Sequence, residues 1–186
     1  VGIPSEGWTT GLHTEDWRYV KFQKQMPSAL YWAFSLSSFH VMPTLLVLAA
    51  LAPVARVLLQ GTSAPPLNVL DAAAAFLTLS GIVIEGVADH QLRRFRREQE
   101  RRGDGASATC DRGLWQWSRH PNYCGECTFW TGLLGFGISS GAVAAEPALA
   151  IGAPLMWAFF RFASVPLMDD RSLERGRRGY EAMMQT

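Results

Sequence analysis

The stretch SRHPNYCGECTFW, which runs from Ser118 to Trp130, places an amide, a phenol and a carboxylate within one turn of a predicted helix. Pro121 suits the first turn of a helix, where its missing N–H costs nothing. In a helix that begins at Pro121, Asn122 and Glu126 lie four residues apart on one side, and Tyr123 follows the same side. These residue types favour a polar ligand held by hydrogen bonds.

Two further polar residues, Arg119 and His120, stand at the entrance to this helix. A helix N-terminus already favours anions through its free N–H groups and its dipole. Glu126 lies about one turn into an apolar segment, too deep for an idle surface charge. The cluster therefore predicts a ligand site, and the alternative is helix capping combined with anchoring at a membrane interface.

A second group of charged side chains recurs at four- and three-residue steps earlier in the chain. Glu85, Asp89, Arg93 and Arg96 share one face of a predicted helix because of this spacing. A carboxylate beside arginines suits a cofactor that carries both hydroxyl or amide groups and phosphates. The alternative is an Asp89–Arg93 ion pair with arginines that extend to the membrane surface.

The pair Cys124 and Cys127 has the spacing of a redox or zinc motif, but its surroundings argue against both. A structural zinc site needs four ligands, and no second Cys or His pair lies at a suitable spacing. A thioredoxin-like pair belongs to an α/β fold rather than to an apolar helix. We therefore expect no metal site, and we expect the two thiols to pack against neighbouring helices.

The elements that position these groups are long apolar blocks separated by charged loops. A bilayer core requires roughly 20 mostly apolar residues per helix. Four blocks meet this need and predict an all-α, polytopic membrane bundle that forms a single domain over residues 1–186. Pro43 and Pro53 are expected to kink the first of them. The predicted spans are residues 29–59, 67–88, 121–145 and 147–168.

Basic residues gather on one side of these spans. The net charge of +1 is uninformative, but most arginines lie in the loop at residues 90–120 and in the tail at 169–186. The positive-inside rule places this loop, the tail and the N-terminal segment 1–28 in the cytoplasm. Trp32, Trp115 and Trp117 are expected at the membrane interface. The membrane would be the endoplasmic reticulum in a eukaryote or the inner membrane in a bacterium, and no nucleic-acid partner is expected.

Three segments together resemble the DUF1295 family of the steroid 5-alpha-reductase C-terminal superfamily. They are GIVIEGVADHQLRRFR, DRGLWQWSRHPNYCGECTFW and SVPLMDDRSLERGRRGY, and EDWRYVKF near the N-terminus fits the same family. The resemblance covers nearly the whole chain. It implies an integral membrane oxidoreductase that uses NADPH to reduce an activated carbon–carbon double bond of a sterol or another lipid.

The resemblance also implies roles for individual residues. Tyr123 and Glu126 become the candidate catalytic residues. The implied NADPH contacts are Asp89, Arg93, Arg96, Arg119, His120, Asn122 and Glu126.

Two other readings stay open. The Arg-His-Pro motif is shared with membrane methyltransferases for isoprenylcysteine or phospholipids, which add two acidic residues to hold S-adenosylmethionine. Asp169 and Asp170 occupy a similar place. The chain is also expected to lack the N-terminal helices of the reductases, so a non-catalytic or truncated membrane module is the third reading.

Overall fold

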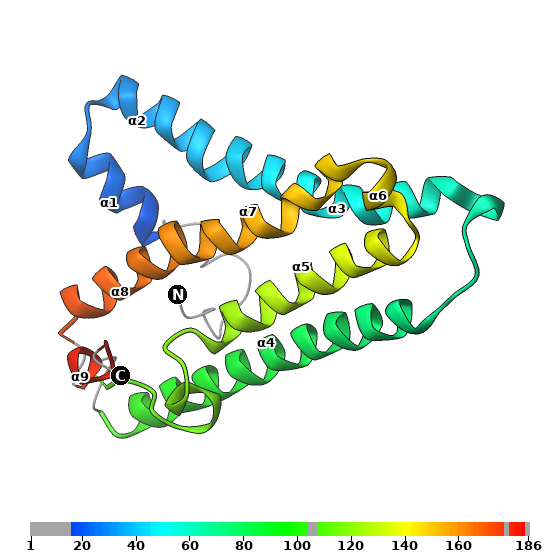
Figure 1. Ribbon diagram of the computed structural model, residues 1–186. Helices are drawn as coiled ribbons and strands as arrows, with labels where there is room; N and C mark the ends of the chain where they lie inside the picture. Colours follow the sequence, from blue (N-terminus) through cyan, green and yellow to red (C-terminus); the bar gives the residue numbers. More distant parts are fainter. Residues whose placement is uncertain (1–15, 104–107, 177–178, 185–186) are drawn as a thin grey trace, which may run out of the picture. The chain divides into compact units, whose positions relative to one another are not determined.

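Helices make up all the regular elements of the computed structural model among the residues that it describes (Figure 1). These residues are 16–103, 108–176 and 179–184. The first fifteen residues of the predicted cytoplasmic N-terminal segment therefore lie outside the described part. The chain divides into two compact units, residues 1–45 and 46–186.

The first unit contains α1 (Trp17–Gln25), α2 (Ser28–Ser35) and the π-helical segment η2 (Leu36–Val41). Asp16 caps α1 by accepting a hydrogen bond from the backbone N–H of Arg18 at 2.9 Å. Phe22 of α1 packs against Phe34 of α2 with ring centroids 4.8 Å apart. Aromatic contacts therefore hold this short helical hairpin together.

The first predicted span is a continuous helical stretch from Ser28 to Ser63, and it includes η2 and α3 (Met42–Gln60). Its irregular turn precedes Pro43. The N–H of Met42 bonds to the carbonyl of Ser37, five residues earlier. Because Pro43 has no N–H to offer the carbonyl of Phe39, a wider turn here accommodates the missing donor.

The second predicted span is the first part of α4, which runs over 33 residues from Val69 to Arg101. Asn68 and Asp71 form a capping box at its start, in which the N–H of Asn68 donates to Asp71 Oδ2 at 2.8 Å, and Asn68 Oδ1 also accepts from the N–H of Leu70 at 2.8 Å. At 1.5 Å per residue the helix is about 50 Å long, and a hydrocarbon core is about 30 Å thick. The arginine-rich final turns of α4 must therefore project beyond the membrane.

The remaining elements are η3 (Gly61–Ser63), the 3₁₀ turn η5 (Gly113–Gln116), α5 (Pro121–Ser139), α6 (Ala142–Ala145) and η6 (Pro147–Ile151). They are followed by α7 (Gly152–Phe159), the π-helical η7 (Phe160–Ser164), α8 (Val165–Glu174) and α9 (Tyr180–Met184). The fourth predicted span continues six residues past Met168, to Glu174. This extension makes Asp169 part of a helix.

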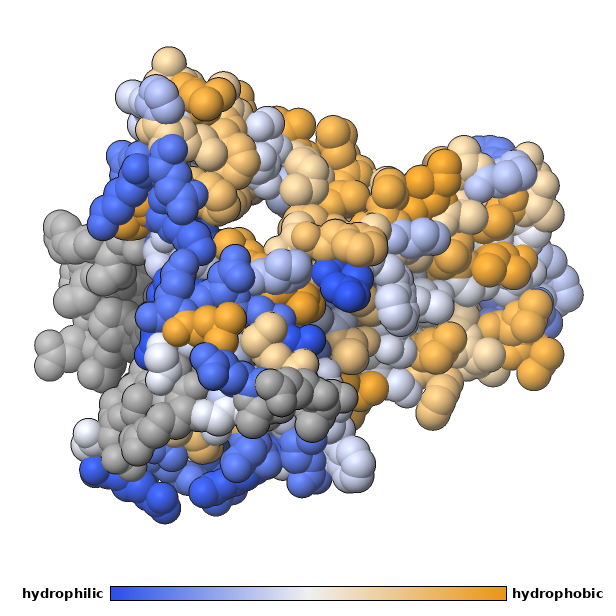
Figure 2. All heavy atoms as spheres, turned by 60° about the vertical axis from the view of Figure 1, so that its left-hand side comes forward, coloured by the Kyte–Doolittle hydropathy of each residue, from blue (hydrophilic) through white to orange (hydrophobic). Residues whose placement is uncertain are grey.

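Three of the described helical stretches are long and apolar enough to cross a membrane: Ser28–Ser63, Val69–Arg101 and Pro147–Glu174. The predicted membrane bundle is confirmed, with three rather than four helices that meet both requirements. The remaining predicted span forms α5, whose 19 residues suffice in length but are less apolar. In Figure 2 hydrophilic residues gather over the end of α4 and the loop after it, and hydrophobic residues cover much of the long helices.

Within the second unit α5 lies between α4 and α7, and it contacts both (Figure 1). Glycines bring α4 and α5 into backbone contact. A Cβ on Gly81 would lie 2.5 Å from the backbone nitrogen of Phe129, and one on Gly125 would lie 2.6 Å from that of Glu85. Small residues at membrane helix interfaces permit this close approach, which sets Glu85 beside the first turns of α5.

We expect Gly81→Ala to destabilise the protein by roughly 1–3 kcal/mol, because the added methyl group meets backbone atoms that cannot move independently. Gly86 provides a matched control on the same helix, since nothing lies within 4 Å of a Cβ added there. Thermal unfolding in detergent measures both variants. Equal melting temperatures for Gly81→Ala and Gly86→Ala would contradict the close α4–α5 contact.

Candidate functional site

The loop after α4 folds back onto that helix and fixes the start of α5. Trp115 donates its indole N–H to the carbonyl of Ala88 at 2.9 Å, and Gln91 accepts from the N–H of Leu114 at 2.9 Å. Trp115 is buried in a cluster with Ala88, Phe95 and Cys110. The ring of Trp115 therefore packs inside the protein and anchors the loop, whereas Trp117 is 83% exposed.

Asp169, near the end of the Pro147–Glu174 helix, is the centre of a buried polar network at the entrance to α5. Its carboxylate oxygens accept from Arg119 Nη1 at 2.6 Å and from the Tyr180 hydroxyl at 2.6 Å. His120 Nε2 lies 2.7 Å from the same carboxylate. Asp169 is only 7% exposed, so these charge-assisted bonds form away from bulk water.

The network fixes the protonation of its two neutral partners. Burial lowers the pKa of His120, and the Asp169 hydrogen bond offsets only part of this effect. The imidazole is therefore neutral at pH 7, and it donates from Nε2 because a carboxylate only accepts. Burial, assisted by the hydrogen bond to Asp169, raises the pKa of Tyr180 to about 12, so the phenol keeps its proton and donates it.

Tyr123 lies in the first turn of α5 between two other rings. It stacks on His120 with centroids 5.2 Å apart and an interplanar angle of 13°. Its other contact is Phe160, at 5.0 Å, in the π-helical segment η7. The N–H of Val165 bonds to the carbonyl of Phe160, five residues earlier, directly before Pro166. This wide turn presents an aromatic face to Tyr123.

A set of polar residues, which we call the polar strip, lies on the first turns of α5 and the neighbouring part of α4; its members are Asn122, Glu126, Glu85 and Asp89. Asn122 and Glu126 lie on α5, and Glu126 is close enough to Glu85 and Asp89 of α4 for electrostatic interaction. The Oδ1 atom of Asn122 is buried and has no hydrogen-bond partner among the described residues. An orphaned buried acceptor of this kind calls for a donor from a ligand or from water.

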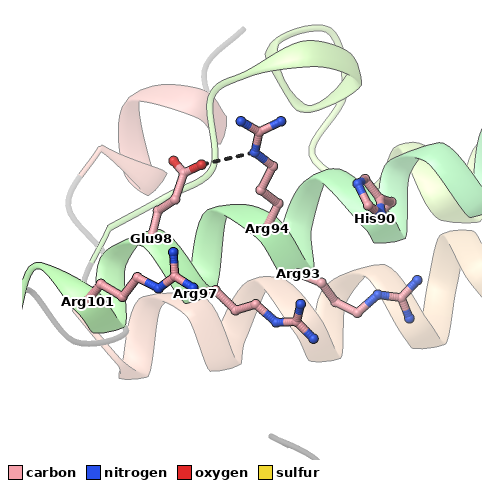
Figure 3. Close-up of a pocket in the computed structure, with 6 residues that line it drawn as sticks. All are labelled: His90, Arg93, Arg94, Arg97, Glu98 and Arg101. Carbon is pink, nitrogen blue, oxygen red and sulfur yellow. Dashed lines mark hydrogen bonds and ion pairs between the residues drawn. The ribbon is translucent and has the colours of Figure 1, made fainter.

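The three arginines that were predicted to contact NADPH lie in different surroundings. Arg93 lines an open cavity of about 470 Å³ on α4 (Figure 3). Arg96 does not line this cavity, and it interacts electrostatically with Asp89 and Arg175. Arg119 is committed to Asp169, as described above. The proposed Asp89–Arg93 ion pair does not form among the described side chains.

The three cysteines are free thiols and differ in their burial. Cys127 is buried and Cys124 is exposed, and neither is in a disulfide. Burial raises the pKa of the Cys110 thiol, which keeps it in its unreactive form. No group of three or more His, Cys, Asp or Glu side chains suited to a metal ion occurs within residues 16–103, 108–176 and 179–184.

Sequence reasoning assigned no role to Tyr180 or Gln91, and it considered Asp169 only as a partner of S-adenosylmethionine. Asp169 carries a weak signal, because a carboxylate directly after an apolar span needs a partner. Tyr180 carries no such sequence signal, because a single aromatic residue in a basic tail does not indicate which residue it contacts. Asp169 lies 49 residues and Tyr180 lies 60 residues after His120 in the sequence, although both contact it in the structure.

A family model described as "Protein of unknown function (DUF1295)" matches residues 6–186, nearly the whole chain. This chain belongs to the DUF1295 family. A curated relative, the "Uncharacterized protein C594.04c" of Schizosaccharomyces pombe, is 28% identical over 152 residues. The alignment covers 73% of this DUF1295 chain and 42% of that protein, so the chain spans less than half the length of its relative. No solved structure matches the chain.

Proposed function

We propose that this DUF1295 protein is an integral membrane oxidoreductase that binds NADPH and reduces an activated carbon–carbon double bond of a sterol or another lipid. The carrying observation is the polar strip between α4 and α5, where Asn122 presents a buried acceptor without a partner. The strip lies beside a membrane-spanning helix and ends at a group of arginines. A dinucleotide cofactor could place its amide group at Asn122 and its phosphates at the arginines.

The residues at the amide end fit a nicotinamide. A carboxamide N–H₂ group donates two hydrogen bonds, and Asn122 Oδ1 is an acceptor that lacks a donor. Glu126, one turn further into α5, supplies a second set of acceptor oxygens. Hydrogen bonds to both would fix the orientation of the ring, because a buried polar group is costly to leave unpaired.

The phosphates would bind at the end of α4. Arg93 and Arg96 are both exposed there, and a guanidinium group can hold a phosphate through two parallel hydrogen bonds. Asp89 lies one turn before Arg93 and would accept from a ribose hydroxyl. The network around Asp169 holds Arg119 and His120 in place, so we assign these two residues to shaping the entrance to α5.

The bound cofactor would supply the hydride, and the protein would supply orientation and a place that excludes water. Tyr123 has its ring fixed by His120 and Phe160, which suits a phenol that positions or protonates a substrate. In this proposal Tyr123 and Glu126 are the catalytic candidates. The end of α4, the loop after it and the tail would face the cytoplasm, as their arginines favour.

Methyl transfer from S-adenosylmethionine is the second candidate, since Asp169 contacts the Arg-His pair of the motif that the methyltransferases share. In those enzymes the acidic pair would bind the cofactor. Here Arg119, His120 and Tyr180 already occupy both oxygens of Asp169, which leaves only the exposed Asp170 for a ligand. This occupancy favours NADPH over S-adenosylmethionine.

Titration of the purified protein in detergent with NADPH, and separately with S-adenosylmethionine, tests the proposal by calorimetry. We expect saturable binding of NADPH and none of S-adenosylmethionine. NADH serves as a control for the contribution of the additional phosphate. The absence of saturable NADPH binding to folded protein would refute the oxidoreductase assignment, and saturable binding of S-adenosylmethionine alone would support methyl transfer.

A further inference from the structure

The open cavity on α4 is lined by six residues of its last turns (Figure 3). Four of them are arginines, and Arg93, Arg97 and Arg101 follow each other at intervals of four residues. We call these three the arginine ladder. The lining residues are His90, Arg93, Arg94, Arg97, Glu98 and Arg101.

The positive charge of the ladder is not compensated within the described part of the chain. Glu98 is the one carboxylate in the cavity lining, and it pairs with Arg94 at 3.1 Å and with Arg112 at 3.3 Å. None of the ladder arginines forms an ion pair with another described residue, and all three are exposed. The ladder is therefore a row of guanidinium groups without a counter-ion among the described residues.

The side chains of the ladder point back along the helix. In Figure 3 the guanidinium groups of Arg93, Arg97 and Arg101 all extend toward the His90 end of α4, which is its membrane-spanning end. This direction follows from helix geometry, because Cβ atoms tilt toward the helix N-terminus. The positive charges are therefore displaced toward the membrane rather than into the cytoplasm.

The surface of α4 changes from apolar to charged close to Ala88, and we place the boundary of the membrane at this level. The exposed apolar residues of α4 end with Val87, and the loop that carries the exposed Trp117 is anchored to Ala88 through Trp115. Tryptophan is enriched at membrane interfaces. At about 1.5 Å per residue, Arg93 starts roughly 8 Å and Arg97 roughly 14 Å beyond this level. Side chains that lean back bring their charges toward the headgroup layer, which is roughly 5–8 Å thick.

We propose that the arginine ladder binds the phosphate groups of anionic phospholipids in the leaflet next to the end of α4. A guanidinium fork matches phosphate geometry, and polybasic segments beside a membrane helix attract anionic lipids. The backward direction of the side chains favours a ligand in the membrane, and competition with inorganic phosphate separates this ligand from a soluble phosphate compound. The proposal depends on membrane insertion and does not depend on NADPH.

Native mass spectrometry of the full chain in detergent, titrated with phosphatidylglycerol or phosphatidylcholine, tests this binding. The test variant combines Arg97→Gln with Arg101→Gln. Arg93 is left unchanged in it because this residue is also assigned to the cofactor. We expect wild type to prefer phosphatidylglycerol, and the double variant to bind it at least about fivefold more weakly, which is the effect expected for one arginine near the headgroups. The double Lys variant at the same positions should retain most of the binding because the charge persists.

Two further measurements complete the test. Arg56→Gln removes one arginine at the other end of the bundle, where it pairs with Glu146, and should leave lipid binding unchanged. Circular dichroism of the double Gln variant in detergent shows whether the fold persists, independently of NADPH. Equal affinity for both lipids, or unchanged phosphatidylglycerol binding in the double Gln variant, would overturn the proposal. Displacement of the lipid by an equal concentration of inorganic phosphate would also overturn it.

Discussion

Replacing Asp169 by asparagine should lower the free energy of unfolding by about 3–5 kcal/mol, the usual cost of breaking a buried ion pair from one side. The carboxylate accepts hydrogen bonds from Arg119, His120 and Tyr180 with only 7% of the residue exposed. An amide has one acceptor oxygen and carries no charge, so Arg119 would lose its counter-ion and one donor would lose its acceptor. The entrance to α5 and the tail after α8 would separate.

Asp170→Asn is the matched control, because the neighbouring residue is exposed and surface substitutions usually change stability by less than about 0.5 kcal/mol. Unfolding of each variant in mixed micelles of mild detergent and sodium dodecyl sulfate, followed by circular dichroism, gives the two free energies. If Asp169→Asn and Asp170→Asn have the same small effect, the network does not stabilise the protein. The Tyr180→Phe variant should fall between them, since it removes one donor and no charge.

Most of the helical architecture is readable from composition alone. Blocks of about 20 apolar residues identify the spans, and the spacing of Asp89, Arg93 and Arg96 on one helix face agrees with the continuation of α4 past Ala88 to Arg101. Pro121 marks the start of α5, because proline is favoured at the first position of a helix and excluded from its interior. These features depend on local residue preferences, which the sequence states directly.

The sequence left undetermined the details that depend on tertiary contact. The π-helical turns before Pro43 and Pro166 were not predicted, because helix propensity does not show where a helix widens to accommodate a proline. The glycines of α5 could be read as flexibility, and only their contact with α4 gives them a packing role.

The candidate site also contains residues that local sequence patterns indicate and residues that only tertiary contacts bring together. Asp89, Arg93, Asn122 and Glu126 were found from spacing, since each helix places its own residues on one face. The cost of a carboxylate at membrane depth also singled out Glu126. Asp169 and Tyr180 were missed as partners of His120, because a contact between segments so far apart in sequence leaves no periodic signal. The roles of Tyr123 and Glu126 in catalysis stay predictions.

Changing Arg93 and Arg96 together to alanine should weaken NADPH binding at least about 100-fold while leaving the protein folded. A hydrogen bond to a charged group contributes about 1.5–3 kcal/mol, and 1.4 kcal/mol corresponds to a factor of ten in affinity. Both arginines are exposed, so their removal leaves no cavity and no buried charge without a partner. Calorimetric titration of the double variant with NADPH measures the loss.

Arg94→Ala is the matched control for this effect because the residue belongs to the same turns of α4 but pairs with Glu98 at 3.1 Å. In Figure 3 its side chain leaves the helix on a different side from that of Arg93. A general loss of positive charge would weaken binding in all these variants, whereas specific phosphate contacts weaken it only in the Arg93 and Arg96 variants. Equal losses for Arg94→Ala and Arg93→Ala would therefore exclude a defined phosphate site on this face, even if NADPH binds.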